Sequence, residues 1–160
     1  MNIPSLHLVT ASESFEPIDN CDYLFLAEMQ ELGGNGLRLL VREGRPVGGP
    51  QDKVIAGHTF HDCTPIKVTA ESAAFEIMWE HYVAYCVLNE SFASPPNDED
   101  VYTGKSFRIY SKSGFRQYIS RSTFATEEYP GPMQHYEVCC QDHVINVIST
   151  QPPTVTQTGP

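Results

Sequence analysis

The sequence predicts an α+β fold, mainly antiparallel β-sheet arranged as a sandwich or half-barrel, with one short helix near residues 113–122. Short segments rich in aromatic and β-branched residues alternate with Gly, Pro and Asn turn signals, which is typical of strands joined by hairpins. The two densest apolar segments, residues 75–91 and 135–150, supply enough apolar side chains for a core. Both also contain polar residues, which need partners if they are buried.

The 160 residues are most simply one globular domain, residues 1–150, followed by a polar, Pro-rich tail, residues 151–160, that has little to bury. A chain of this length buries roughly 70% of its unfolded surface, which supports a core without metals or disulfides. Five cysteines without a repeated spacing, and an N-terminus without the pattern of an export signal, predict reduced thiols and a cytoplasmic protein. The longest apolar run, residues 83–88, is far shorter than the roughly 20 residues of a membrane-spanning helix, so no membrane contact is predicted.

The first strand pair is expected at Tyr23–Met29 and Leu37–Val41. The four residues Gly33-Gly34-Asn35-Gly36 between them can take the positive φ angles of a hairpin turn. A loop rich in Gly and Pro follows over residues 44–53. The remaining short strand candidates are Val54–Thr59, Ile66–Thr69 and Lys105–Tyr110.

The helix near residues 113–122 is predicted from its N-cap and its apolar face. Ser113 can accept a hydrogen bond from the first turn, and Phe115, Tyr118 and Ile119 fall on one side of the helix. The segment Ser94–Asp100 before it is expected to be an exposed acidic loop.

The segment from residue 75 to residue 88 fits two periods. A strand would align seven residues on one face: Phe75, Ile77, Trp79, His81, Val83, Tyr85 and Val87. A helix would also give an apolar stripe: Phe75, Met78, Trp79, Tyr82, Val83, Cys86 and Val87. Aromatic and β-branched enrichment favours a long or bent strand, with Trp79 in the core, and we expect strands over residues 135–149 as well.

A resemblance is found over residues 64–153. The order FEI-x-W-x-x-YVAY-x-V-x-NES, then SxSGF-x-x-YI, then HYEV-x-C-x-DHVINVIS is similar to a group of small uncharacterised bacterial proteins. The resemblance implies a bacterial origin and one compact domain. It implies no catalytic residue, because no activity is established for that group.

Charge is distributed unevenly within the net charge of −10. The acid-only segment, residues 1–37, has six acids and no Lys or Arg, whereas the base-rich segment, residues 105–121, has five bases and no acid. The acids, with Glu13, Glu16 and Asp19 as candidate contacts, either form a face for a basic protein partner or are neutralised within the fold. The net negative charge argues against general nucleic-acid binding.

The sequence predicts no cofactor. Gly104-Lys105-Ser106 lacks the earlier glycine of a phosphate-binding loop, since Glu99 stands in its place. No H-E-x-x-H zinc helix and no G-x-S-x-G nucleophile elbow is present.

Two groups of metal-ligating residue types occur, but neither has the paired spacing of a zinc site. The first comprises His58, His61, Asp62 and Cys63, and the second His135, Cys139, Cys140, Asp142 and His143. In a strand, His135 and Cys139 would share one face and Cys140 would lie on the other, which divides the second group. We therefore predict no metal site.

Catalysis by a cysteine–histidine pair is the other chemical alternative. It would use Cys86, Cys139 or Cys140 with His81, His135 or His143, but the apolar neighbours of these cysteines favour inert packing. Glu90 and Asp142 could form an acid–base pair, although an acidic chain offers many such pairs.

The sequence-based hypothesis is a small, acidic protein-binding module, specifically an immunity-type inhibitor of a toxin domain. The alternative is a small-ligand-binding or hydrolytic enzyme domain. Its pocket would lie near Trp79, His81, Tyr85 and His143, and Glu90 and Asp142 are further candidate contacts. A deep pocket with converging polar groups would favour the alternative, and a flat acidic surface the protein-binding role. The residues do not predict an oligomeric state.

Overall fold

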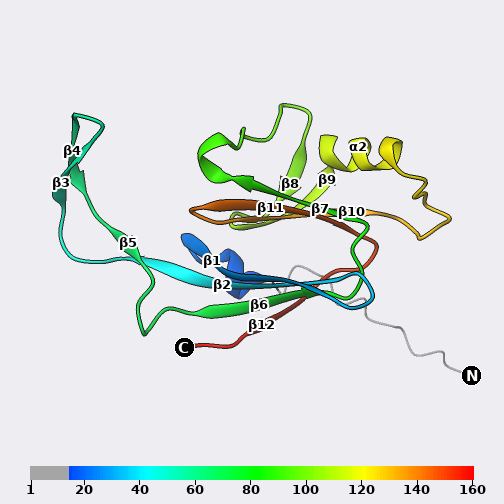
Figure 1. Ribbon diagram of the computed structural model, residues 1–160, viewed down its shortest axis with the longest axis horizontal. Helices are drawn as coiled ribbons and strands as arrows, with labels where there is room; N and C mark the ends of the chain where they lie inside the picture. The colour runs from blue at the N-terminus through cyan, green and yellow to red at the C-terminus, as the bar shows by residue number, and fades with distance from the viewer. Residues whose placement is uncertain (1–14) are drawn as a thin grey trace, which may run out of the picture.

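The computed structural model describes residues 15–160, which form two antiparallel five-stranded sheets, a layer of helix and loops over one of them, and a two-stranded hairpin that projects from the body (Figure 1). The predicted α+β class, dominated by antiparallel sheet, is confirmed. No helix in this part of the chain is long and apolar enough to cross a membrane.

The first sheet contains the N-terminal hairpin and the C-terminal strand, and the short helix α1 (Glu16–Asp19) precedes it. Its spatial order is β1 (Tyr23–Leu32), β2 (Gly36–Pro46), β6 (Ala74–Trp79) and β12 (Thr154–Gln157), with β5 (Ile66–Lys67) paired to the end of β2. The predicted turn joins β1 and β2, and Gly34 and Asn35 have φ angles of 76° and 63° there.

The second sheet lies beside the first in Figure 1 and is covered on its outer side. Its spatial order is β7 (Ala84–Asn89), β11 (His143–Ser149), β10 (Gln134–Cys139), β9 (Phe107–Lys112) and β8 (Val101–Thr103). Helix α2 (Gly114–Ser122) and the loop that starts with the 3-10 turn η1 (Glu90–Phe92) form the covering layer. As predicted, Ser113 caps α2, since its Oγ accepts the Arg116 N–H at 3.0 Å.

The core lies between the facing sides of the two sheets. Alternate residues of each strand enter it, as the period of two requires. The buried side chains from the central strands are Leu37, Leu39, Val41, Phe75, Ile77, Trp79, Tyr136, Val138, Ile145 and Val147. Trp79 is 1% exposed, which confirms the strand period and its place in the core.

The apolar segment from residue 75 to residue 88 is extended, as predicted, but it contributes a strand to each sheet. β6 belongs to the first sheet and β7 to the second. Between them, the N–H of Tyr82 donates to the Asn35 carbonyl at 2.9 Å and that of Val83 donates to the Ile148 carbonyl at 2.7 Å. These two bonds fasten the crossing to both sheets. The second apolar segment is likewise two strands, β10 and β11, joined by a tight turn in which the Cys140 N–H donates to the His143 carbonyl at 2.8 Å.

Two expectations are corrected in the middle of the chain. Residues 54–59 do not form one strand, because Ala56 and Gly57 take φ angles of 50° and 81° and turn the chain between β3 (Gln51–Ile55) and β4 (His58–Cys63). The predicted strand at residues 66–69 is reduced to the two residues of β5.

A further correction concerns residues 151–160, which we expected to be a polar tail outside the domain. β12 pairs antiparallel with β6 along four residues, and Pro153 before it is buried. Thr154, Val155 and Thr156 are β-branched, so they suit a strand, and β6 would otherwise expose its free edge. The final residues therefore complete the first sheet.

Candidate functional site

The predicted pocket near Trp79, His81, Tyr85 and His143 does not form. Trp79 lies in the core with its Nε1 unpartnered in the described structure, and His81 is exposed with its Nδ1 2.8 Å from the Gly34 carbonyl oxygen. Tyr85 and His143 lie at different ends of the second sheet, since Tyr85 pairs with Val147 whereas His143 pairs with Asn89. Sequence reasoning placed these residues together because it could not anticipate the crossing between the sheets.

Tyr85 instead connects the second sheet to β1. Its hydroxyl donates to Glu31 Oε1 at 2.6 Å, and the Tyr82 hydroxyl donates to the same oxygen at 3.1 Å. The two rings meet edge to face with their centroids 4.9 Å apart. The hydrogen bonds from Tyr85 and Tyr82 lower the pKa of Glu31, and the bond to Glu31 raises the pKa of Tyr85 to about 12. Glu31 therefore links β1 to Tyr82 and Tyr85 within the chain.

Glu90, Asp142 and His143 gather at one end of the second sheet. The Glu90 N–H donates to the Asp142 carbonyl at 3.3 Å, and His143 Nδ1 lies 3.2 Å from Asp142 Oδ1 without the alignment of a hydrogen bond. Glu90 and Asp142 are exposed. The carboxylates of Glu90 and Asp142 are therefore solvated, whereas His143 Nδ1 is enclosed without a hydrogen-bond partner among the described residues.

The acid-only segment contacts the start of the base-rich segment. Asp19 Oδ1 accepts backbone N–H groups from Ser106 at 2.8 Å and from Phe107 at 3.1 Å, and Asp22 forms an ion pair with Lys105. Contacts within the chain therefore account for Asp19 and Asp22. Glu16 is exposed, and Glu13 lies outside the described residues.

The β3–β4 hairpin, hereafter the arm, is an exposed two-stranded structure. Every residue of its two strands is exposed except Cys63. Val54, Ile55 and Phe60 are 67%, 50% and 50% exposed, although they are large and apolar. In Figure 1 the arm extends away from the two sheets, beyond the end of β2.

A buried polar cluster lies on the outer face of the second sheet, opposite the core. His135, Glu137 and Cys139 alternate along β10 on that face, and the first two are 3% and 8% exposed. His135 Nδ1 lies 2.7 Å from Ser113 Oγ, and its Nε2 lies 2.9 Å from Asn146 Oδ1. The Tyr110 ring stacks on the His135 ring at 4.2 Å between centroids.

Burial sets the protonation state of the His135 ring. It lowers the pKa of His135, against the raising effect of the bond to Asn146, so the ring is neutral near pH 7. Nε2 then donates its single proton to Asn146 Oδ1, and Nδ1 accepts the hydroxyl proton of Ser113. Ser113 is 1% exposed and its Oγ also accepts the Arg116 N–H, so this chain of bonds fastens α2 to the sheet rather than presenting a nucleophile.

Glu137 is the acidic member of the cluster. Its Oε1 accepts hydrogen bonds from Arg108 Nη1 at 2.8 Å, Tyr110 OH at 3.1 Å and Cys139 Sγ at 3.3 Å. Sequence reasoning missed Glu137, Arg108 and Tyr110. The sequence does indicate this face of the strand, because positions 135, 137 and 139 are polar and alternate with apolar positions.

Cys139 and Cys140 are not activated as nucleophiles. Burial, followed by the charge of Glu137, raises the pKa of the Cys139 thiol to about 12, and burial also raises that of Cys140. Both are thus protonated at neutral pH. His135 and Cys139 share a face, as predicted, and among residues 15–160 no group of three or more potential ligands is placed to hold a metal ion.

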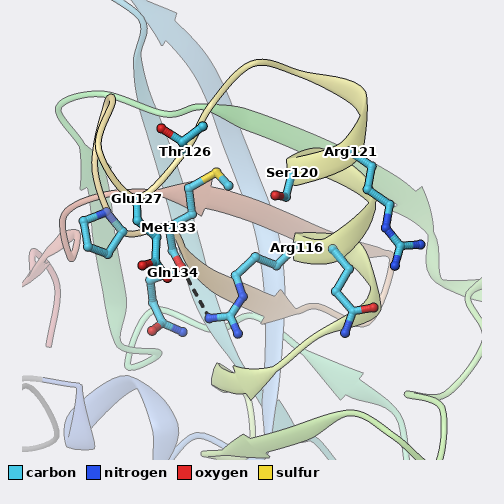
Figure 2. Close-up of a pocket in the computed structure, with 9 residues that line it drawn as sticks. Arg116, Ser120, Arg121, Thr126, Glu127, Met133 and Gln134 are labelled. Carbon is cyan, nitrogen blue, oxygen red and sulfur yellow. Dashed lines mark hydrogen bonds between the residues drawn. The ribbon is translucent and has the colours of Figure 1, made fainter.

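A cavity of about 440 Å³ lies between α2 and the loop that leads to β10 (Figure 2). Arg116, Arg121 and Glu127 line it. Arg116 donates to the Met133 carbonyl at 3.3 Å, the dashed line in Figure 2, and to the Ser111 carbonyl at 2.9 Å. Its guanidinium therefore ties α2 to the ends of β9 and β10.

No protein-family model, curated protein or solved structure matches this chain. The fold defines a two-sheet antiparallel domain with a covering layer and a projecting arm. The resemblance to a bacterial group stays a prediction.

Proposed function

We propose that this chain is a protein-binding module whose arm contacts the partner. The supporting observation is the exposure of Val54, Ile55 and Phe60 on two strands that contact mainly each other. An isolated two-stranded hairpin is marginally stable in water, and three or more strands or a packing surface are needed to stabilise it. A partner that covers the arm would supply that surface.

The register of the arm places apolar side chains on both of its faces. Val54 pairs with Thr59 and Ile55 pairs with His58, so Ile55 and Phe60 share one face and Val54 points from the other. Covering one such side chain contributes about 1.5–3 kcal/mol. Loss of Ile55 and Phe60 together should therefore weaken binding by about tenfold or more.

The proposed partner is a basic protein. The chain has a net charge of −10, and acids such as Glu16, Glu90 and Asp142 are exposed, whereas Asp19 and Asp22 have partners within the chain. Complementary charge raises the association rate, and salt screens it. Small size and acidity also support the finer proposal that the chain is an immunity-type inhibitor of a toxin domain.

The experiment uses the full chain, tagged and exposed to a lysate of its source, with three variants in parallel. The first is Ile55→Ser with Phe60→Ser, the second Val54→Ser, and the control Tyr118→Ser with Phe124→Ser, which alters side chains 63% and 92% exposed near α2. The retained protein is identified, purified and titrated with each variant. The proposal predicts that the control binds like the wild type, that at least one arm variant loses affinity, and that salt weakens binding.

Two outcomes would overturn the proposal. One is a wild-type chain that retains no more protein than the arm variants. The other is a concentration-dependent dimer of the wild type that the arm variants abolish, because a second copy would then occupy the arm. The inhibitor role is tested separately, by whether adding the chain suppresses the activity of the purified partner.

A further inference from the structure

The outer face of the second sheet contains a cavity that the protein-binding role does not use. The segment 93–96, which contains Pro95 and Pro96, covers it, and two neighbouring hollows of about 330 and 460 Å³ share that segment, Glu137 and Val144 in their walls. The loop is fastened at its end, because Asp100 Oδ1 accepts the Gly114 N–H of α2 at 2.8 Å. The loop lies above the second sheet in Figure 1.

Two polar groups in this cavity lack a partner. Glu137 Oε1 is held by three donors, whereas no hydrogen bond reaches Oε2 from the described residues. Asn146 Oδ1 is held by His135, whereas its Nδ2 has no partner within residues 15–160. Both residues are 8% exposed and line the cavity, and neither atom is among the fully enclosed unpartnered ones. Both atoms therefore retain some exposure to solvent.

These groups form a fixed donor–acceptor pair. Glu137 and Asn146 stand directly opposite each other on β10 and β11, a relation that places Cβ atoms about 4.5–5.5 Å apart. Glu137 offers an acceptor, and Asn146 offers a donor because its oxygen is committed to the neutral His135 ring. Leu88, Val144 and Pro96 provide apolar wall around them.

We propose that this cavity binds a small uncharged molecule through a carboxamide-type edge, in which an N–H of the ligand donates to Glu137 Oε2 and its carbonyl accepts from Asn146 Nδ2. An uncharged ligand suits the two unpartnered groups, since Arg108 compensates the charge of Glu137 and both oxygens of Asp100 already accept backbone N–H groups, from Gly114 and Asn97. Hydrogen bonds at two buried groups would fix the orientation, and the apolar wall would cover the body of the molecule.

The test compares three probes of similar size by chemical-shift changes in the full, isotope-labelled chain. Benzamide has both the N–H and the carbonyl, acetophenone has only the carbonyl, and benzoate has an added negative charge. The proposal predicts binding of benzamide with a Kd on the order of 1 mM, as expected for so few atoms, and at least about tenfold weaker binding of the other two.

Variants then reverse the two groups one at a time. Asn146→Asp keeps the oxygen that His135 needs and replaces the Nδ2 donor by an acceptor. Glu137→Gln keeps an oxygen for Arg108, Tyr110 and Cys139 and places an amide donor at the free position. Each single variant should lose benzamide binding, and the double variant should regain it, because a benzamide turned end for end then matches both groups. A merely structural role would not produce this recovery.

The arm variant Ile55→Ser with Phe60→Ser is the matched control and should bind benzamide like the wild type, which separates this site from the proposed protein-binding role. If one single variant does not fold, as shown by a spectrum without dispersed signals, the other single variant and the three probes on the wild type still test the proposal. Equal binding of benzamide and acetophenone, no benzamide binding to the wild type, or unchanged binding in a folded single variant would overturn the proposal.

Discussion

Arg108 and Glu137 face each other across β9 and β10, with Arg108 Nη1 2.8 Å from Glu137 Oε1. The two side chains are 24% and 11% exposed, so water screens the pair only partly. The guanidinium also lies over the Tyr102 ring, 4.7 Å from its centroid. Arg108 therefore joins three neighbouring strands of the second sheet, β8, β9 and β10.

Replacing Arg108 by Met should lower the free energy of unfolding by about 1–3 kcal/mol, because Glu137 then keeps its buried position without its charged donor. Urea denaturation measures this change. Arg45→Met is the matched control: Arg45 pairs with Glu43 but is 46% exposed, so its loss should change stability by about 0.5 kcal/mol or less. An equal loss of unfolding free energy in the two variants would contradict the claim that the Arg108–Glu137 pair stabilises the protein more than the exposed Arg45–Glu43 pair.

Trp79→Ala should cost about 3–5 kcal/mol of unfolding free energy, since it leaves a cavity in the core between the sheets. Tyr118→Ala, at a side chain 63% exposed on α2, should change stability by about 0.5 kcal/mol or less. Denaturant titration followed by circular dichroism compares the two variants. A small effect of Trp79→Ala would place the ring outside the core.

Stability should fall as the pH is lowered below about 6.5, where histidine in the unfolded chain begins to take up a proton. Burial lowers the pKa of His135 in the folded protein, so the unfolded state binds the proton first. The contribution is fully present above the unfolded pKa and is lost as the pH falls toward the folded one, by at most about 1.4 kcal/mol per pH unit.

Unfolding free energies at pH 7.5, 6.5 and 5.5 check this prediction, and His135→Gln should flatten the dependence. His58→Gln is the control, since His58 is exposed on the arm and should leave the slope unchanged. A wild-type stability independent of pH across this range would contradict a neutral, buried His135.

Val155→Asp should destabilise the protein by more than about 1 kcal/mol, because it places a charge on the core-facing side of β12. Thr156→Asp, one residue further, faces the opposite side and is exposed, so it should change stability by about 0.5 kcal/mol or less. Thermal unfolding of both variants compares them directly. Similar melting temperatures of the two variants would contradict the pairing of β12 and would indicate that residues 151–160 are a tail outside the domain.

Local sequence patterns predicted the β1–β2 pair, the turn at Gly34 and the cap at Ser113 because each depends on neighbouring residues. They failed where partners come from distant segments. Whether β6 and β7 join one sheet or two depends on the bonds of Tyr82 and Val83 to Asn35 and Ile148. β12 was missed because its strand also needs the free edge of β6, which lies about 75 residues earlier in the chain.

The candidate site was less predictable than the fold. The polar row on β10 was visible as alternation, but its partners Arg108, Ser113 and Asn146 come from β9, the start of α2 and β11. The predicted pocket combined residues from one stretch of sequence, and the sheet crossing separated them. The exposed arm could not be recognised, because Val54 and Ile55 have the composition of a buried strand.

Amide hydrogen exchange along the arm tests the central claim most directly. In the isolated chain, the N–H groups of residues 51–63 should exchange within the fastest class of strand amides, because a lone hairpin is marginally stable. Adding the purified partner should slow the exchange of these amides specifically. Slow exchange in the isolated chain, or an arm that stays unprotected in the complex, would contradict the account.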